Sequence, residues 1–270
     1  MVAEAFQRTL AGHPEPLEHR VIGKVGQVVW VRSLSKAFYE NGRPMGIRGV
    51  LSDISARKKS EEELRESYAK VRRMFDDIVN VLASTIELRD PYTAGHQRRV
   101  AELVAALGSE LGLPPEELNG LRIAGLVHDV GKVIVPAEIL SKPGQLSELE
   151  MYLVRAHPEA GFNVLRGIDF PWPVAEIVYQ HHERLDGSGY PRGLKGDAVL
   201  FEARILAVAD VVEAMSSHRP YRPALGIEAA LAEIQTGKGR LYDPQVVDAC
   251  VSLFRKGFAF DEGEGRQARL

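Results

Sequence analysis

Histidines and aspartates in the second half of the chain have the types and spacing of metal ligands. His128 and Asp129 are adjacent, and His181 and His182 form another adjacent pair about fifty residues later. The first pair closes an apolar run that starts at Leu121 and has helical periodicity. Burying an imidazole and a carboxylate without partners is unfavourable. We therefore expect these groups to be paired, hydrogen-bonded or bound to a metal.

Other residues of the same types extend this set. Taken singly, a histidine is usually structural, but here the imidazoles and carboxylates come from several predicted helices and no cysteine accompanies them. Nitrogen and oxygen ligands of this kind suit a two-metal hydrolytic centre better than a structural zinc site. Neighbours on a helix diverge by about 100°, so one can hold one metal while the next reaches between two. The predicted ligands are His96, His128, Asp129, His157, His181, His182 and Asp210.

The elements that must position these ligands are predicted to be helical. Apolar periodicity with Gly- and Pro-bearing loops between the segments indicates one compact all-α domain. The expected helices cover residues 97–111, 115–130, 148–165, 173–182, 201–215, 227–235 and 244–254. Cys250, in the last of these, is expected to be a small buried hydrophobe without a functional role.

A β-rich piece and a charged helix are predicted before this domain. Residues 21–54 alternate apolar and polar side chains around Asn41-Gly42, which predicts an antiparallel hairpin that needs a further element to pack on. The fold class is therefore mainly α, with a long helix and a short N-terminal β piece in front of the helical bundle.

The long helix carries a heptad pattern. Its apolar residues alternate in steps of four and three, which indicates a two-stranded parallel coiled coil and a homodimer through residues 60–85. The alternative is one amphipathic helix that lies on the next domain. Asp90-Pro91 is expected to end this helix. The pattern consists of Leu64, Tyr68, Val71, Phe75, Ile78 and Leu82.

Charge and hydropathy exclude some functions. The formal net charge is −3, which argues against a nucleic acid polymer as partner while leaving room for a local cationic pocket. No apolar run reaches the ~20 residues that a membrane span requires, and the N-terminus lacks the apolar core of a signal peptide. We expect a cytoplasmic protein with a small phosphorylated ligand.

Between about residues 85 and 254 the sequence resembles the HD-GYP family, a branch of the HD-domain metal-dependent phosphohydrolases. The resemblance rests on Glu87 to His96, His128 to Lys132, His157-Pro158-Glu159, the His181 to Pro191 block, Arg204 to Asp210, and Arg219 to Ala224. A bare His-Asp pair is a weak signal, but the block His-His-Glu-Arg-Leu-Asp-Gly-Ser-Gly-Tyr-Pro in register with it is specific. Residues 26–58 resemble the last strands and exit helix of a PAS sensor domain, without the parts that complete its ligand pocket.

These resemblances imply a division of the chain and a function. The segments are 1–56, a partial PAS piece; 57–85, a coiled-coil signalling helix; 86–257, an HD-GYP domain; and 258–270, a flexible tail. The implied activity is hydrolysis of cyclic di-GMP to linear pGpG, GMP or both, by in-line attack of hydroxide at two divalent ions, Fe or Mn.

The resemblance also implies roles for individual residues. His96, His128 and Asp210 would hold one ion and His157, His181 and His182 the other, with Asp129 bridging. Lys132, Tyr190, Arg219 and Arg222 would contact substrate, although Lys132 could serve only as a helix-end cation and the arginines only as solvated loop residues. Glu183 and Asp186 are expected to fix imidazole tautomers.

Two departures from the family pattern and two other readings remain. Tyr92 stands where members with a third metal carry glutamate, so we expect two ions, and His218 stands where aspartate is frequent. The alternatives to a cyclic di-GMP phosphodiesterase are a receptor that binds the dinucleotide without turnover and an HD phosphohydrolase of another cyclic dinucleotide or nucleotide. Turnover by metal-loaded protein separates these readings.

Overall fold

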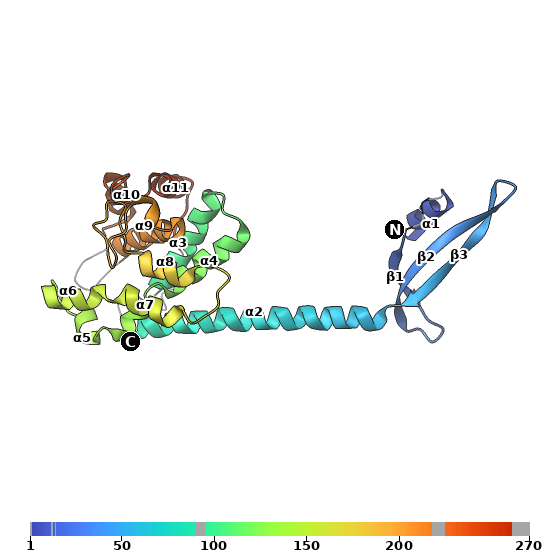
Figure 1. The fold of residues 1–270 in the computed structure, drawn as a ribbon, viewed down its shortest axis with the longest axis horizontal. Coiled ribbons are helices and arrows are strands. Elements are labelled where there is room, and N and C mark those ends of the chain that lie inside the picture. The colour runs from blue at the N-terminus through green and yellow to red at the C-terminus, as the bar shows by residue number, and fades with distance from the viewer. Residues whose placement is uncertain (1, 12, 14, 90–94, 218–224, 261–270) are drawn as a thin grey trace, which may run out of the picture. The chain divides into compact units, whose positions relative to one another are not determined.

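The computed structural model describes residues 2–11, 13, 15–89, 95–217 and 225–260. The chain divides into two compact units, Met1–Phe75 and Asp76–Leu270. The predicted fold class, mainly helical with a short antiparallel sheet near the N-terminus, is confirmed (Figure 1). Within the described ranges, no helix combines the length and the apolar character that crossing a bilayer requires.

The first unit contains a three-stranded antiparallel sheet in the order β1-β2-β3. Strand β2, Val28–Glu40, pairs through its first half with β1, Leu17–Ile22, and through Val31–Glu40 with β3, Arg43–Asp53. The predicted Asn-Gly turn is present, with Asn41 at φ 49° and Gly42 at φ 77°. Helix α1, Val2–Leu10, and strand β1 extend this unit beyond the predicted hairpin.

The second unit is helical. Its core includes Val79 and Ala83 from helix α2, Ser55–Arg89, and the buried faces of the helices that follow. Asp90 and Pro91, where the helix was expected to end, lie outside the described residues. The remaining elements are α3 His96–Glu110, α4 Pro115–Val127, η1 Val130–Ile134, α5 Ala137–Leu140, α6 Glu148–Arg155, α7 His157–Leu165, α8 Val174–Gln180, η2 Gly196–Ala198, α9 Phe201–Ser216, α10 Ile227–Thr236 and α11 Pro244–Arg255.

Helix α9 lies at the centre of this unit and contacts α3, α4, α8, α10 and α11. Its buried residues are nearly all apolar, among them Ile205, Leu206 and Val208. Two acidic residues, Asp210 and Glu213, interrupt this apolar helix three positions apart, so they share one face. That face is turned toward the predicted ligands.

Two predicted helices have different bounds in the structure. The expected helix 148–165 is divided into α6 and α7, because Pro158 lacks an amide hydrogen and its ring disfavours continued helix through the preceding turn. The expected helix 115–130 ends at Val127, and the chain continues as the tight turn η1. In both places the change of direction occurs at a predicted ligand, His157 and the His128-Asp129 pair.

Candidate metal centre

A close backbone contact brings the His128-Asp129 pair next to α7. Gly131 lies in η1, which packs on α7. A Cβ atom at this position would lie 1.8 Å from the carbonyl oxygen of His157 and 2.5 Å from the amide nitrogen of Gly161. Only glycine fits there. The sequence therefore needs Gly131 if Asp129 is to reach His157.

The first group of ligand candidates comes from α3, the end of α4 and α9. Nε2 of His96 lies 3.4 Å from Oδ1 of Asp210 and 3.8 Å from Oδ2 of Asp129. Nε2 of His128 lies 3.4 Å from Oδ2 of Asp129 and 3.8 Å from Oδ1 of Asp210. These separations exceed those of ordinary hydrogen bonds. Two imidazoles and two carboxylates thus converge with room for a cation between them.

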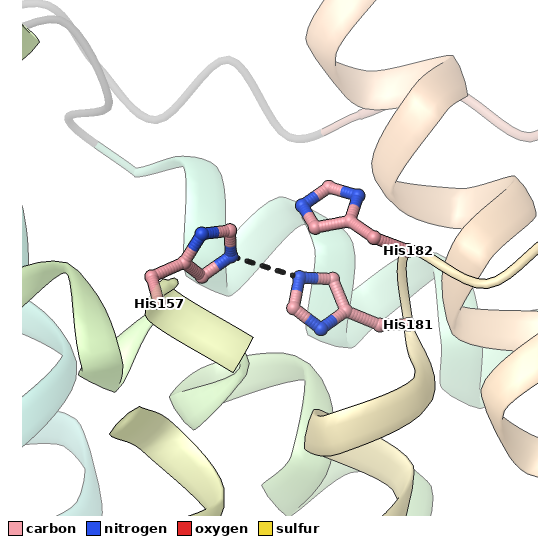
Figure 2. A group of neighbouring side chains, drawn as sticks. All are labelled: His157, His181 and His182. Atoms are coloured by element: carbon pink, nitrogen blue, oxygen red, sulfur yellow. Dashed lines mark hydrogen bonds between the residues drawn. The ribbon is translucent and has the colours of Figure 1, made fainter. Parts of the chain in front are cut away.

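The second group consists of His157, His181 and His182. One nitrogen from each ring lies within 4.8 Å of the others. Figure 2 shows the three rings turned toward one another, and its dashed line joins Nε2 of His157 to Nε2 of His181, which are 3.3 Å apart. His157 begins α7, and the adjacent pair follows the last turn of α8.

Asp129 lies between the two groups. Its Oδ2 faces His96 and His128, while its Oδ1 lies 3.4 Å from Nε2 of His157. One carboxylate thus presents a different oxygen to each set of imidazoles. The structure brings all of the predicted ligands together around this side chain.

Backbone carbonyls fix the orientation of three imidazoles. Nδ1 of His128, His157 and His181 donates to the carbonyl oxygen three residues earlier, at distances of 2.7, 2.7 and 2.6 Å. In a neutral ring the proton on Nδ1 leaves a lone pair on Nε2. All three lone pairs therefore point into the centre, which is the arrangement that metal-binding histidines use.

This arrangement fits divalent cations better than it fits the side chains alone. With both Nδ1 atoms donating, Nε2 of His157 and of His181 are acceptors that face each other, and neither can donate to the other. Nε2 of His128 is buried and has no hydrogen-bond partner among the described residues. Buried acceptors without donors are unfavourable, and a cation between them removes the penalty.

The charge states suit metal binding. Burial lowers the pKa of His181 to about 3 and also lowers the pKa of His157, so both rings are neutral ligands at neutral pH. Burial alone would raise the pKa of Asp129, but the charges of Lys132 and His128 hold it well below its usual value. Burial opposes protonation of His96, yet Asp210 and Glu213 raise its pKa to about 9. A bound cation takes the place of that proton.

Glu213 and Arg99 belong to the site, although the sequence analysis did not single them out. Glu213 is buried in α9, and its Oε2 accepts a hydrogen bond from Nδ1 of His96. Its Oε1 accepts hydrogen bonds from Nε of Arg99 at 2.7 Å and from the hydroxyl of Ser217 at 2.6 Å. A carboxylate of this kind orients a ligand histidine and raises its basicity. The available signal was a glutamate three residues after Asp210 in an apolar helix.

We expect Glu213→Gln to weaken divalent metal binding about 10- to 100-fold. The amide can still accept from Nδ1 of His96, but it loses the charge that holds the ring and Arg99 in place. Metal titration followed by calorimetry measures the change. Glu233→Gln, at an exposed position of α10, removes the same charge away from the centre and should bind metal as the unaltered protein does. Equal affinities for both variants would contradict this role.

The loop after His182 is held by Glu183, which corrects one expectation. Glu183 does not contact an imidazole: its carboxylate accepts hydrogen bonds from the backbone amides of Arg192 at 2.8 Å and Leu194 at 3.0 Å. Asp186 likewise caps its own turn at the amide of Ser188. Backbone carbonyls and Glu213 fix the tautomers instead, because the helix ends bring them closer to Nδ1 than the loop acids.

Tyr190 is placed over the second histidine group by this loop. A Cβ on Gly189 would lie within 2.5 Å of backbone atoms of His182, Glu183 and Arg184, so the chain folds back on itself only with glycine there. The phenol ring of Tyr190 stacks on the ring of His182, with centroids 4.7 Å apart and planes at 28°. Tyr190 therefore forms a wall of the centre.

The other predicted substrate contacts have different outcomes. Nζ of Lys132 lies 2.8 Å from Oδ2 of Asp129, and the Lys132 side chain is only 14% exposed, so this cation is inside the centre. Arg219 and Arg222 lie outside the described residues. The same is true of Tyr92 and His218, the two departures from the family pattern.

Comparison with known proteins is consistent with this geometry. Residues 80–246 match the HD domain family. The chain is 42% identical over 191 residues to the cyclic di-GMP phosphodiesterase response regulator RpfG of Xanthomonas campestris, covering 70% of this chain and 50% of that protein. It is 36% identical over 260 residues to 3'3'-cGAMP-specific phosphodiesterase 3 of Vibrio cholerae, covering 94% of this chain and 52% of that protein.

A solved structure shares the fold. The crystal structure of the cyclic GMP-AMP specific phosphodiesterase V-cGAP3 of V. cholerae superposes with a TM-score of 0.50 at 20% sequence identity, over 66% of this chain and 49% of that one. At this identity the likeness concerns the fold alone. The chain spans about half the length of the curated relatives it matches.

Proposed function

Because the chain belongs to the HD domain family, we propose that its helical unit hydrolyses a phosphodiester bond of cyclic di-GMP at a binuclear metal centre, yielding linear pGpG, GMP or both. The observation that carries this proposal is Asp129, whose two carboxylate oxygens face separate groups of imidazoles. The names of relatives such as RpfG support the substrate. The block from His181 to Pro191 supports placement in the HD-GYP branch.

The proposed assignment of ligands follows the two groups. His96, His128 and Asp210 hold one divalent ion, and His157, His181 and His182 hold the other, with Asp129 between them. Iron or manganese suits a site built from imidazole and carboxylate without sulfur. Divalent ions bound there polarise the phosphate and supply a nucleophile at neutral pH.

The chain's own residues orient the substrate and hold charge. Lys132, one tight turn after Asp129, is placed to contact the scissile phosphate and to neutralise the charge that develops on its oxygens. Tyr190 covers His182 and excludes water from that side. Glu213 and Arg99 keep His96 oriented. We also propose Arg219 and Arg222 as phosphate contacts, from their residue type and position in the sequence.

Turnover is the test of this proposal. Protein loaded anaerobically with iron or manganese is incubated with cyclic di-GMP, and the linear dinucleotide and GMP are followed by chromatography. Hydrolysis is expected. Binding without hydrolysis would favour a receptor. Because similarity to the V. cholerae 3'3'-cGAMP-specific phosphodiesterase extends over 94% of the chain, 3'3'-cGAMP is the second candidate substrate, and preferential hydrolysis of it in the same assay would reassign the activity.

We further propose the division predicted from the sequence, with a partial PAS piece over residues 1–56, a signalling helix over 57–85, the HD-GYP domain over 86–257 and a tail over 258–270. The heptad residues of α2 support a homodimer, since Leu64, Tyr68 and Val71 are all exposed. Phe75, Ile78 and Leu82 continue the same spacing and are also exposed. A second copy of this helix covers such a seam in a parallel coiled coil.

We expect Val71→Glu to convert the dimer to a monomer, because it places a charge in the middle of the apolar seam. Light scattering at micromolar concentration measures the mass. Ala69→Glu adds the same charge to the same helix at a position outside the seam, and should remain dimeric. An unaltered protein that is monomeric under these conditions would refute the coiled coil.

A further inference from the structure

An arginine without an assigned role lies next to the wall of the centre. Arg155 is the last residue of α6 and is exposed to solvent. Its guanidinium carbon lies 5.5 Å from the centroid of the Tyr190 ring. Among the described residues, no carboxylate forms an ion pair with it. By contrast, Arg192, which also lies over a tyrosine, is paired with Glu176 at 3.0 Å.

The contacts of Arg155 lead directly to the metal ligands. Arg155 lies over the ring of Tyr190, which stacks on His182, a member of the second histidine group. One aromatic ring therefore separates the guanidinium from a ligand of the centre. The loop that carries Tyr190 is fixed by the two backbone hydrogen bonds to Glu183. The position of the cation relative to the centre is thus set by ordered neighbours.

The proposed substrate has two anions, and the centre can accept only one. A cyclic dinucleotide carries two phosphodiesters in a single ring, so when one lies between the metal ligands and Lys132, the other must lie nearby and outside. Guanidinium binds phosphate oxygens through paired hydrogen bonds and holds its charge at every physiological pH. A planar cation beside an aromatic ring, free of a competing carboxylate, has the chemistry for that second anion.

We propose that Arg155 binds the second, non-scissile phosphate of the cyclic dinucleotide, an inference that rests on the proposed function. It assigns the face between α6 and the Tyr190 loop as a substrate subsite distinct from the ligands and from Lys132. It also explains recognition of a two-phosphate ring over a simple phosphodiester. The contribution appears in substrate binding, since this phosphate does not change charge during the reaction.

The test compares substrates with two phosphates and with one. For cyclic di-GMP, we expect Arg155→Ala to raise KM about tenfold with kcat little changed, as expected for loss of one charge-assisted hydrogen bond at a solvent-accessible site. For bis(p-nitrophenyl) phosphate, which has no second anion, kcat/KM should not change. Equilibrium dialysis of radiolabelled cyclic di-GMP with metal-free protein provides a readout independent of turnover, and the same variant should bind more weakly there.

Two further variants make the result specific. Arg166→Ala removes an exposed arginine that also lies over an aromatic ring, Phe162, and should leave both substrates unaffected. Arg155→Lys keeps the charge and should recover most of the affinity. If lysine behaves as alanine does, Arg155 stacks on a guanine base and the phosphate assignment is wrong.

The remaining outcomes separate this inference from the proposed function. If the unaltered protein hydrolyses cyclic di-GMP and Arg155→Ala has the same KM, the inference fails and the function stands. If both substrates lose activity equally, Arg155 acts on the centre itself and the subsite is refuted. If the unaltered protein neither binds nor hydrolyses a cyclic dinucleotide, the proposed function fails and this inference with it.

Discussion

Replacing Asp129 with alanine lowers hydrolysis of cyclic di-GMP by more than about a thousandfold in the account given above. Residues that only orient a ligand cost about 10- to 100-fold when they are replaced, and removing one donor from a preorganised site costs up to about a thousandfold. Asp129 should exceed both, because its two oxygens face both histidine groups. Initial rates by chromatography, with metal content measured on the same samples, test this.

Two further variants control for folding and for charge. Asp129→Asn keeps the side-chain volume and one carbonyl oxygen, so it should fold normally yet fail to serve both groups, and it should be nearly as inactive as the alanine variant. Asp169→Ala removes an exposed carboxylate elsewhere in the same unit and should be fully active. Substantial turnover by a folded Asp129→Asn protein would show that no bridging carboxylate is needed.

Removing the metal ions should abolish turnover and also destabilise the helical unit. Chelation leaves the acceptors Nε2 of His157 and His181 facing each other at 3.3 Å with nothing between them. A ligand present at 100 times its Kd contributes about 2.7 kcal/mol, which corresponds to a decrease in melting temperature of about 5 to 10 °C for a domain of this size. Calorimetry before and after dialysis against dipicolinate measures this difference.

Restoration by specific ions distinguishes metal loss from damage. Manganese or ferrous iron should restore both the melting temperature and turnover, whereas magnesium should restore little, because it prefers oxygen ligands and retains its water. Asp129→Asn protein should show a much smaller change on chelation. Unchanged activity after the ions have been removed would exclude a metal-dependent reaction at this site.

The convergence of the ligands was predictable from sequence because each lies in a recognisable local pattern. His128-Asp129 follows an apolar helix, and His181-His182 precedes a glycine-rich block. Glu213 was missed because its partner, His96, is far away in the sequence, and only the packing of α3 on α9 brings the two together. Long-range hydrogen bonds of this kind leave little local signal.

The expectation for Glu183 was wrong for a related reason. Its position beside two histidines suggested a hydrogen bond to an imidazole, but the rings already donate to carbonyls of their own helix turns. The buried carboxylate instead accepts backbone amides of the folded loop. Which donors a buried acid meets depends on how the loop closes, and Gly189 controls that closure.

Helix bounds were predicted least accurately where the backbone serves the site. The expected helix 148–165 ignored Pro158, and the expected helix 115–130 continued through Asp129. Apolar periodicity persists across both breaks, so it reports which face is buried and not whether the helix is continuous. Helix α1 was not predicted, because the polar N-terminal stretch carries only a weak apolar pattern.

Anomalous X-ray diffraction from crystals of anaerobically prepared protein, collected at the iron and manganese absorption edges, tests the central claim most directly. The account predicts two peaks in each helical unit. One lies among His96, His128 and Asp210, the other among His157, His181 and His182, and Asp129 contacts both. A single peak in fully loaded protein, or peaks away from Asp129, would contradict it.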